Sequence, residues 1–134
     1  MEIITGKRPT FTKLDLRNKK DVHDFFEGLS ENSIAGVIHF AALKSVGESV
    51  EKPLLYYENN IIGLTNLLEA TKKANVDKFV FSSSCTVYGS PESLPVTEET
   101  VIGYTPSPYG YTKQVCERIL DDSVNSITNF KVMS

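Results

Sequence analysis

Residues 78–89 read Lys78-Phe79-Val80-Phe81-Ser82-Ser83-Ser84-Cys85-Thr86-Val87-Tyr88-Gly89. An apolar run that ends in three serines is typical of a buried strand with hydroxyl groups at its carboxyl end. In open parallel α/β sheets, ligands bind in the crevice beyond those strand ends. The stretch therefore predicts a strand over 79–83 that leads into a ligand site.

A helix that carries reactive groups is expected after that strand. Ser107-Pro108 is a typical helix start and predicts a helix over 108–122. Tyr109 and Lys113 then lie one turn apart on the same face. An ammonium beside a phenol favours the phenolate, so the tyrosine could act as a base near neutral pH. An isolated Tyr-x-x-x-Lys spacing also fits an ordinary exposed pair, and the serine cluster upstream favours the site.

A second strand and a second ligand-facing loop are predicted near residue 40. Residues 37–40 form a continuous apolar run apart from His39, as expected for an interior parallel strand covered on both faces. We expect His39 to be a core histidine and His23 to lie on an exposed helix face. Small residues in 41–49 would let a ligand approach the backbone, and Lys44 offers a cation there.

A long helix is predicted from Pro53 to about Ala74, because proline is favoured in the first turn of a helix. Its expected apolar face consists of Leu54, Tyr57, Ile61, Leu64, Leu67 and Leu68. Asn59 and Asn60 lie inside it, where amide side chains lower helix propensity. At least one of them is therefore expected to reach across the crevice, with surface placement as the alternative.

The N-terminal part predicts a short strand and a helix. Residues 10–14 alternate between polar and apolar side chains and lead to Asp15, whose carboxylate could accept ligand hydrogen bonds or cap a helix. Asn18 followed by Asp21 is typical of a helix start, and Gly28 would end that helix. Its apolar residues at helical spacing are Val22, Phe25, Phe26 and Leu29.

The order of predicted elements defines the fold class. Strands alternate with helices, a last strand begins at 130–133, and a long loop rich in Gly and Pro separates Gly89 from Ser107. This order implies right-handed parallel crossovers. We therefore expect an α/β protein, with 1–134 forming a partial Rossmann-like parallel sheet with flanking helices.

Composition excludes several classes of function. The chain has 134 residues, a net charge of -3 and no Lys/Arg block, so it shows no electrostatic footprint for nucleic acid. Its two cysteines, Cys85 and Cys116, are too few for a disulfide framework and have no zinc-ligand spacing. No run approaches the roughly 20 apolar residues of a membrane span. We expect a soluble cytoplasmic protein with reduced thiols and no metal.

Four runs together carry a resemblance to a known family. They are His39 to Ser49, Tyr56-Tyr57-Glu58-Asn59-Asn60, Phe81 to Gly89, and Ser107-Pro108-Tyr109. With these runs the chain, from Gly6 to about Asp122, resembles the extended short-chain dehydrogenase/reductase family, and within it the nucleotide-sugar 4-epimerases. The resemblance implies an NAD cofactor, a UDP-sugar substrate and a homodimer formed through helices like 53–74 and 108–122.

The resemblance also implies roles for individual residues. Tyr109 would be the catalytic base, Lys113 would bind the nicotinamide ribose and assist Tyr109, and Ser84 would hydrogen-bond the sugar hydroxyl. The implied cofactor-binding residues are Asp15, Leu16, Phe40, Ala41, Ala42, Leu43, Lys44, Asn59, Ser84, Tyr109 and Lys113. The implied substrate-binding residues are Lys44, Ser84 and Tyr109.

Two departures from the family pattern bear on activity. Related dehydratases carry an acid pair directly after the serine or threonine, whereas this chain has Cys85 and Thr86, which favours epimerisation over water elimination. The glycine-rich phosphate loop is missing, since the eight glycines are scattered. We therefore expect a span without the glycine-rich unit and the substrate lobe, with little turnover of its own. An inactive remnant is the alternative, and the 11–15 segment should pair with the strand near 36–40 or detach.

Overall fold

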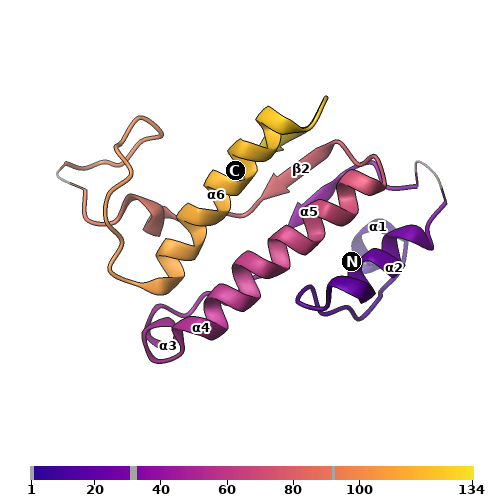
Figure 1. Ribbon diagram of the computed structural model, residues 1–134, viewed down its shortest axis with the longest axis horizontal. Helices are drawn as coiled ribbons and strands as arrows, with labels where there is room; N and C mark the ends of the chain where they lie inside the picture. The colour runs from indigo at the N-terminus through magenta and orange to yellow at the C-terminus, as the bar shows by residue number, and fades with distance from the viewer. Residues whose placement is uncertain (1, 31–32, 92) are drawn as a thin grey trace.

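The computed structural model describes residues 2–30, 33–91 and 93–134. Within them, three parallel strands form one sheet in the order β1-β2-β3, with β1 at Val37–His39, β2 at Lys78–Phe81 and β3 at Lys131–Met133. The α-helices are α1 (Glu2–Thr5), α2 (Lys19–Glu27), α3 (Val46–Glu51), α4 (Pro53–Tyr56), α5 (Gly63–Lys73) and α6 (Pro108–Ser126). Helices α5 and α6 run in front of the strands, with α2 beside α5 (Figure 1). The predicted α/β class with a parallel sheet is confirmed.

The two faces of the sheet differ sharply in exposure. Phe79 and Phe81 of β2 point toward the helices and are buried. On the opposite face Ile38, Val80 and Met133 lie side by side in the parallel register, and they are 65%, 38% and 70% exposed. The prediction that 37–40 is an interior strand covered on both faces is therefore wrong, because β1 has no second neighbour among the described residues.

The predicted strand over 10–14 is also wrong. Residues 7–15 form no helix or strand, and none of them pairs with β1. A strand needs a partner for its backbone groups, and alternation of side chains cannot supply one. The segment is held by its apolar side chains instead, since Leu14 and Leu16 pack against the core.

Helix α2 forms as its local signals predicted. The Asn18 side chain accepts a hydrogen bond from the backbone N–H of Asp21, and Gly28 caps the other end. Val22 and Phe26 are buried against α5. The prediction that His23 lies on an exposed helix face is wrong, because its side chain is only 11% exposed and contacts α5.

The predicted long helix after Pro53 is interrupted by a wide turn. Residues 57–62 form the π-helix η1 between α4 and α5. A π turn adds a residue per hydrogen-bonded ring and rotates the following face. Tyr56 and Asn60 are buried, whereas Leu54, which precedes the π turn, is 79% exposed. The predicted apolar face is therefore wrong at Leu54, and Tyr57, which was predicted to lie on the same face, is half-buried.

Helix α6 completes the layer over β2 and β3. Ser107 caps it by accepting a hydrogen bond from the Gly110 N–H. Cys116 and Leu120 enter the shared core with Leu64, Phe79 and Phe130. The predicted strand after Phe130 is confirmed as β3.

The described part of the long loop, residues 89–91 and 93–107, is fixed at its base. Gly89 has φ +63°, and a Cβ there would meet the Tyr104 carbonyl oxygen at 2.2 Å, so glycine is required. Gln114 of α6 donates hydrogen bonds to the carbonyl oxygens of Val87 and Gly103, both at 2.7 Å. These bonds hold the two ends of the loop together beside β2.

Candidate functional site

The structure brings the lysine of the predicted pair to the carboxyl end of β2. Lys113 is 4% exposed, and its Nζ donates a 2.6 Å hydrogen bond to the Ser82 carbonyl oxygen. The same atom lies 4.5 Å from the centroid of the Phe81 ring. Burial lowers the pKa of Lys113, and nearby Cys116 and Glu117 oppose that change. A cation therefore sits among the groups just beyond the strand end.

Tyr109 lies one turn before Lys113 at the start of α6. It is 8% exposed, and its hydroxyl makes no hydrogen bond to another described residue. The start of α6 is closely packed, because a Cβ on Gly110 would lie 2.7 Å from the Thr105 Oγ1. The phenol is thus held by its surroundings while its oxygen has no protein partner in the described chain.

The serines after β2 have different environments. Ser84 caps the turn η2 (Cys85–Tyr88), and its Oγ accepts hydrogen bonds from the Thr86 N–H at 3.3 Å and from the Thr86 hydroxyl at 3.0 Å. Its own proton has no acceptor among the described residues. The Ser83 Oγ is buried without a partner in the same part of the molecule. The described residues contain no hydrogen bond between Ser84 and either Tyr109 or Lys113.

His39 behaves as the core histidine that the sequence predicted. Its ring stacks on Phe81, with centroids 5.9 Å apart. The pKa of His39 is lowered to about 4, by burial first and by the charge of Lys113 second. It is therefore neutral at physiological pH.

Several predicted cofactor residues share one cavity of about 480 Å³. It is lined by Lys13, Leu14, Asp15, Leu16, Arg17, Ala41, Ala42, Leu43 and Asn59. The cavity separates the segment that failed to form a strand from the loop after β1. Phe40 and Lys44 were predicted to belong to the same set, but they are exposed and do not line this cavity.

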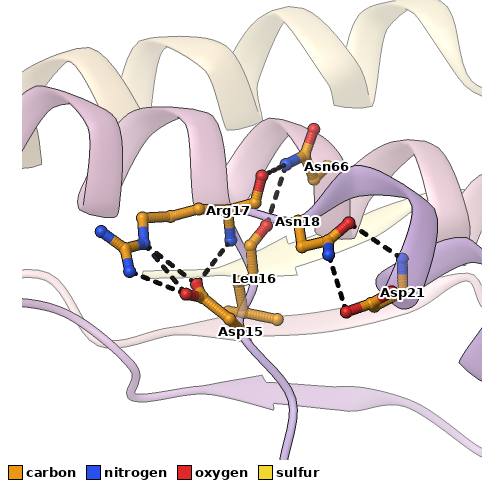
Figure 2. Close-up of polar contacts among 6 residues, drawn as sticks. All are labelled: Asp15, Leu16, Arg17, Asn18, Asp21 and Asn66. Atoms are coloured by element: carbon orange, nitrogen blue, oxygen red, sulfur yellow. Dashed lines mark hydrogen bonds and ion pairs between the residues drawn. The ribbon is translucent and has the colours of Figure 1, made fainter.

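Asp15 is paired with Arg17 (Figure 2), and both residues line the cavity. The guanidinium Nη2 lies 2.7 Å from the Asp15 Oδ2, and Nε donates to both carboxylate oxygens. These bonds lower the pKa of Asp15 to about 2. The carboxylate stays ionised, and Asn66 of α5 fixes the same segment by donating to the carbonyl oxygens of Leu16 and Arg17.

The loop after β1 is anchored by two buried side chains, Asn60 and Tyr56. The prediction that Asn59 or Asn60 reaches across the crevice is confirmed by Asn60, whereas Tyr56 was not predicted to have such a role. The amide of Asn60 accepts from the Leu43 N–H at 2.9 Å and donates to the Leu43 carbonyl oxygen at 3.0 Å. The Tyr56 hydroxyl accepts from the Ser45 N–H and donates to Glu48, both at 3.0 Å. For Asn60, the signal in the sequence was an amide side chain inside a predicted helix. For Tyr56 there was no such signal, because the 3.6-residue spacing of the apolar side chains did not place it on the buried face.

A second cavity, of about 190 Å³, lies near the C-terminal ends of α2 and α5. His23 and Lys73 are among its lining residues, and the Lys73 Nζ lies 3.1 Å from the His23 Nδ1. None of the predicted site residues lines it. We therefore assign the candidate site to the carboxyl ends of the strands, where parallel sheets bind ligands.

The parallel sheet, the helices on one face and the cavity at the strand ends define a partial Rossmann-like α/β domain. The family model described as "NAD dependent epimerase/dehydratase family" matches residues 2–134. The chain belongs to this family, as the resemblance predicted.

Named relatives are similar over almost the whole chain. It is 50% identical to the UDP-glucose 4-epimerase of Drosophila melanogaster over 131 residues, which is 98% of this chain and 37% of that protein. It is 53% identical to the Bacillus subtilis UDP-glucose 4-epimerase over 119 residues, which is 89% of this chain and 34% of the relative. The chain thus spans a little over a third of the length of these relatives.

Solved structures agree with the sequence matches. The UDP-glucose 4-epimerase from Bifidobacterium longum, in complex with NAD+ and UDP, superimposes with a TM-score of 0.90 at 46% identity, covering 98% of this chain and 38% of that one. The UDP-Glc/GlcNAc 4-epimerase from Campylobacter jejuni gives a TM-score of 0.88 at 33% identity, with 98% and 39% covered.

Proposed function

We propose that the protein is an NAD-dependent UDP-glucose 4-epimerase, which interconverts UDP-galactose and UDP-glucose. The main support is the arrangement at the start of α6, where the buried Lys113 contacts the end of β2 and Tyr109 lies one turn away with a free hydroxyl. These are the residue types that a proton transfer next to a sugar carbon requires. The similarity to 4-epimerases supports the choice of substrate.

The residues present fit one part of an NAD molecule. The cavity between 13–17 and 41–43 offers an ionised Asp15 and the small residues Ala41 and Ala42, which allow close approach to the backbone. Asn59 lines the same cavity. The partnerless Ser83 hydroxyl is a further polar group available beyond β2. We propose Asp15, Leu16, Phe40–Lys44, Asn59, Ser84, Tyr109 and Lys113 as the cofactor-binding residues.

In the proposed reaction, the residues of this chain handle the proton and the sugar. Tyr109 takes the proton of the sugar 4-hydroxyl as the C4 hydrogen leaves as hydride, and it returns the proton after the 4-keto sugar has turned over. Bound NAD supplies the hydride acceptor and then the hydride donor, so no net redox change occurs. Ser84 donates a hydrogen bond to the sugar oxygen and keeps its proton. Lys44 is a further substrate contact, and Lys113 stabilises negative charge nearby.

Epimerisation is favoured over elimination of water by the residues after Ser84. Elimination needs a general acid and a general base beside the sugar. Cys85 and Thr86 occupy these positions, and the Thr86 hydroxyl already donates to Ser84. The described turn therefore supplies no carboxylate for a dehydratase reaction.

We further propose that the complete enzyme works as a homodimer in the cytoplasm. Helical segments η1 and α6 carry exposed apolar side chains, including Ile62 and Tyr111, and the rings of Tyr57 and Tyr111 pack edge to face with centroids 6.4 Å apart. Such exposed apolar side chains fit a helical interface. Both free cysteines fit a reducing compartment. Among the described residues, no helix is long and apolar enough to cross a membrane.

The first experiment measures NAD released by denaturing the purified 134-residue chain. We expect far less than one NAD per chain, because this chain has no glycine-rich phosphate loop to bind the pyrophosphate. Catalysis is tested in a chimera in which residues 2–134 replace the matching span of the Bifidobacterium longum enzyme. Conversion of UDP-galactose to UDP-glucose is expected, and Tyr109→Phe should abolish it while NAD remains bound. A chimera that binds NAD but converts no UDP-sugar would reject the proposed function.

A further inference from the structure

We infer that Thr112 and Asn60 are positioning residues, which hold Tyr109 in register with the loop after β1. Thr112 is fully buried, and its Oγ1 donates a 2.7 Å hydrogen bond to the Tyr109 carbonyl oxygen. The Thr112 Oγ1 also accepts a 3.0 Å hydrogen bond from the Asn60 Nδ2. Asn60 in turn holds both backbone groups of Leu43. One continuous path of hydrogen bonds therefore joins Leu43 to Tyr109, and its Asn60–Thr112–Tyr109 part is buried.

The amide of Asn60 has no spare hydrogen-bonding capacity in this path. Its Nδ2 donates to Leu43 and Thr112, and its Oδ1 accepts from the Leu43 N–H and from the Asn59 amide at 3.0 Å. An asparagine side chain offers two donors and one oxygen that accepts two bonds. Since all four are used, the amide cannot rotate without losing buried bonds, and each such loss is costly.

The π turn is what presents Asn60 to α6. Because residues 57–62 are wound more widely, the Asn60 side chain points inward. The backbone carbonyl oxygen of Asn60 faces Cys116. The Cys116 Sγ donates to that oxygen at 3.5 Å. The thiol thereby gives a hydrogen-bond donor to a backbone carbonyl within the π turn, where the regular helical hydrogen bonds are altered.

The path connects the two halves of the proposed site, and this inference rests on the proposed function. Leu43 lies between Ala42 and Lys44 in the proposed cofactor loop, and Thr112 precedes Lys113. Neither Thr112 nor Asn60 reaches the reacting atoms through its own side chain, since those side chains bond to the backbone of Leu43 and Tyr109 and to each other. Small displacements of a catalytic group can cost up to about a hundredfold in rate. We therefore assign the pair a geometric role in placing the tyrosine base.

The structural part of the test uses the 134-residue chain itself. Thr112→Val keeps the shape of the side chain but removes the hydroxyl, and Thr112→Ser restores it. We expect hydrogen exchange at the Leu43 amide to accelerate about tenfold or more in Thr112→Val and to stay near the parent rate in Thr112→Ser. The Ser45 amide, which is held by Tyr56, is the internal control and should be unchanged. Equal Leu43 exchange in the parent and Thr112→Val would overturn the inference.

The functional part uses the chimera described above. In Thr112→Val we expect kcat to fall about tenfold or more while KM for UDP-galactose stays within about twofold, with Thr112→Ser close to the parent. A kcat that is unchanged in Thr112→Val, or equally reduced in both variants, would refute the positioning role. If the parent chimera lacks epimerase activity, the proposed function fails, and the Leu43 exchange measurement still decides whether the path exists.

Discussion

The ammonium of Lys113 donates a 2.6 Å hydrogen bond to the carbonyl oxygen of Ser82, the first residue beyond β2. Burial lowers the pKa of this lysine, which means that the folded protein disfavours the charged form of the Lys113 side chain. A charge kept in place at a cost to folding is typical of groups that are retained for function. The pair therefore links the stability of the domain to the chemistry proposed for it.

We expect Lys113→Met to leave the free energy of unfolding near pH 7 unchanged or to raise it by about 1 kcal/mol, because an apolar side chain replaces a buried charge. In the parent, the lowered pKa means that the unfolded chain binds the proton more readily, so stability rises as pH approaches 10.5. The variant should lack this rise. Urea unfolding at pH values of about 7 and 9.5 measures both effects. A loss above about 2 kcal/mol near pH 7 would show that the Ser82 bond outweighs the buried charge.

His39 predicts a loss of stability in mild acid. Its pKa is about 4 in the folded protein and 6.5 when unperturbed, so below about pH 6.5 the unfolded chain takes up the proton first. Stability should fall by about 1 kcal/mol between pH values of about 7.5 and 5.5 through this group alone. His39→Gln, which cannot titrate, should lack that contribution. Parallel urea titrations test this, and equal acid losses in the two proteins would contradict it.

Gly110→Ala should destabilise the start of α6. The added Cβ would lie 2.7 Å from the Thr105 Oγ1 and 3.1 Å from the Thr105 Cβ, so the helix or its neighbour must shift, at about 1–3 kcal/mol. Gly47→Ala is the matched control, because its Cβ would meet nothing within 4 Å in α3 and should stabilise by about 0.5–1 kcal/mol. Thermal unfolding distinguishes the two. A pair of variants with equal melting temperatures would refute the close packing.

Gln114→Leu should loosen the loop that precedes α6. The variant removes both 2.7 Å hydrogen bonds that hold Val87 and Gly103. Limited proteolysis within residues 93–102 should then become several times faster, because local opening costs less free energy. Arg118→Gln, which removes only an exposed pair with Asp122 on the same helix, is the control and should cleave at the parent rate. Equal cleavage in Gln114→Leu and the control would show that other contacts hold the loop.

The uncovered face of the sheet should make the 134-residue chain self-associate. Ile38 and Val80 are neighbours on that face and are both exposed. Exposed apolar patches and unpaired strand edges promote association. Ile38→Thr should lower the apparent mass at high concentration in light scattering and leave the free energy of unfolding within about 0.5 kcal/mol of the parent value. A parent that stays monomeric at all concentrations would contradict this prediction.

Local signals in the sequence were sufficient to predict the helix starts, the strands β2 and β3 and the spacing of the reactive residues. Asn18 and Ser107 cap their helices as predicted, since a cap needs only the next few residues. The apolar runs of β2 and β3 were predicted as parallel strands, and they pair in parallel. The positions of Tyr109 and Lys113 one turn apart also followed from the sequence, because helical spacing fixes them.

Other features depended on contacts between distant segments. The alternation in residues 10–14 did not become a strand, because pairing needs a neighbour that only the assembled sheet can supply. The π turn, and with it the inward position of Asn60, is stabilised by Leu43, Thr112 and Cys116 from other parts of the chain. A period of 3.6 residues cannot reveal such a turn, since its energy comes from those partners. The sequence by itself thus determined the capped helices, the apolar strands β2 and β3 and the reactive residue types. The tertiary structure decided which segments pair and how the helix after Pro53 is wound, because both depend on partners distant in the sequence.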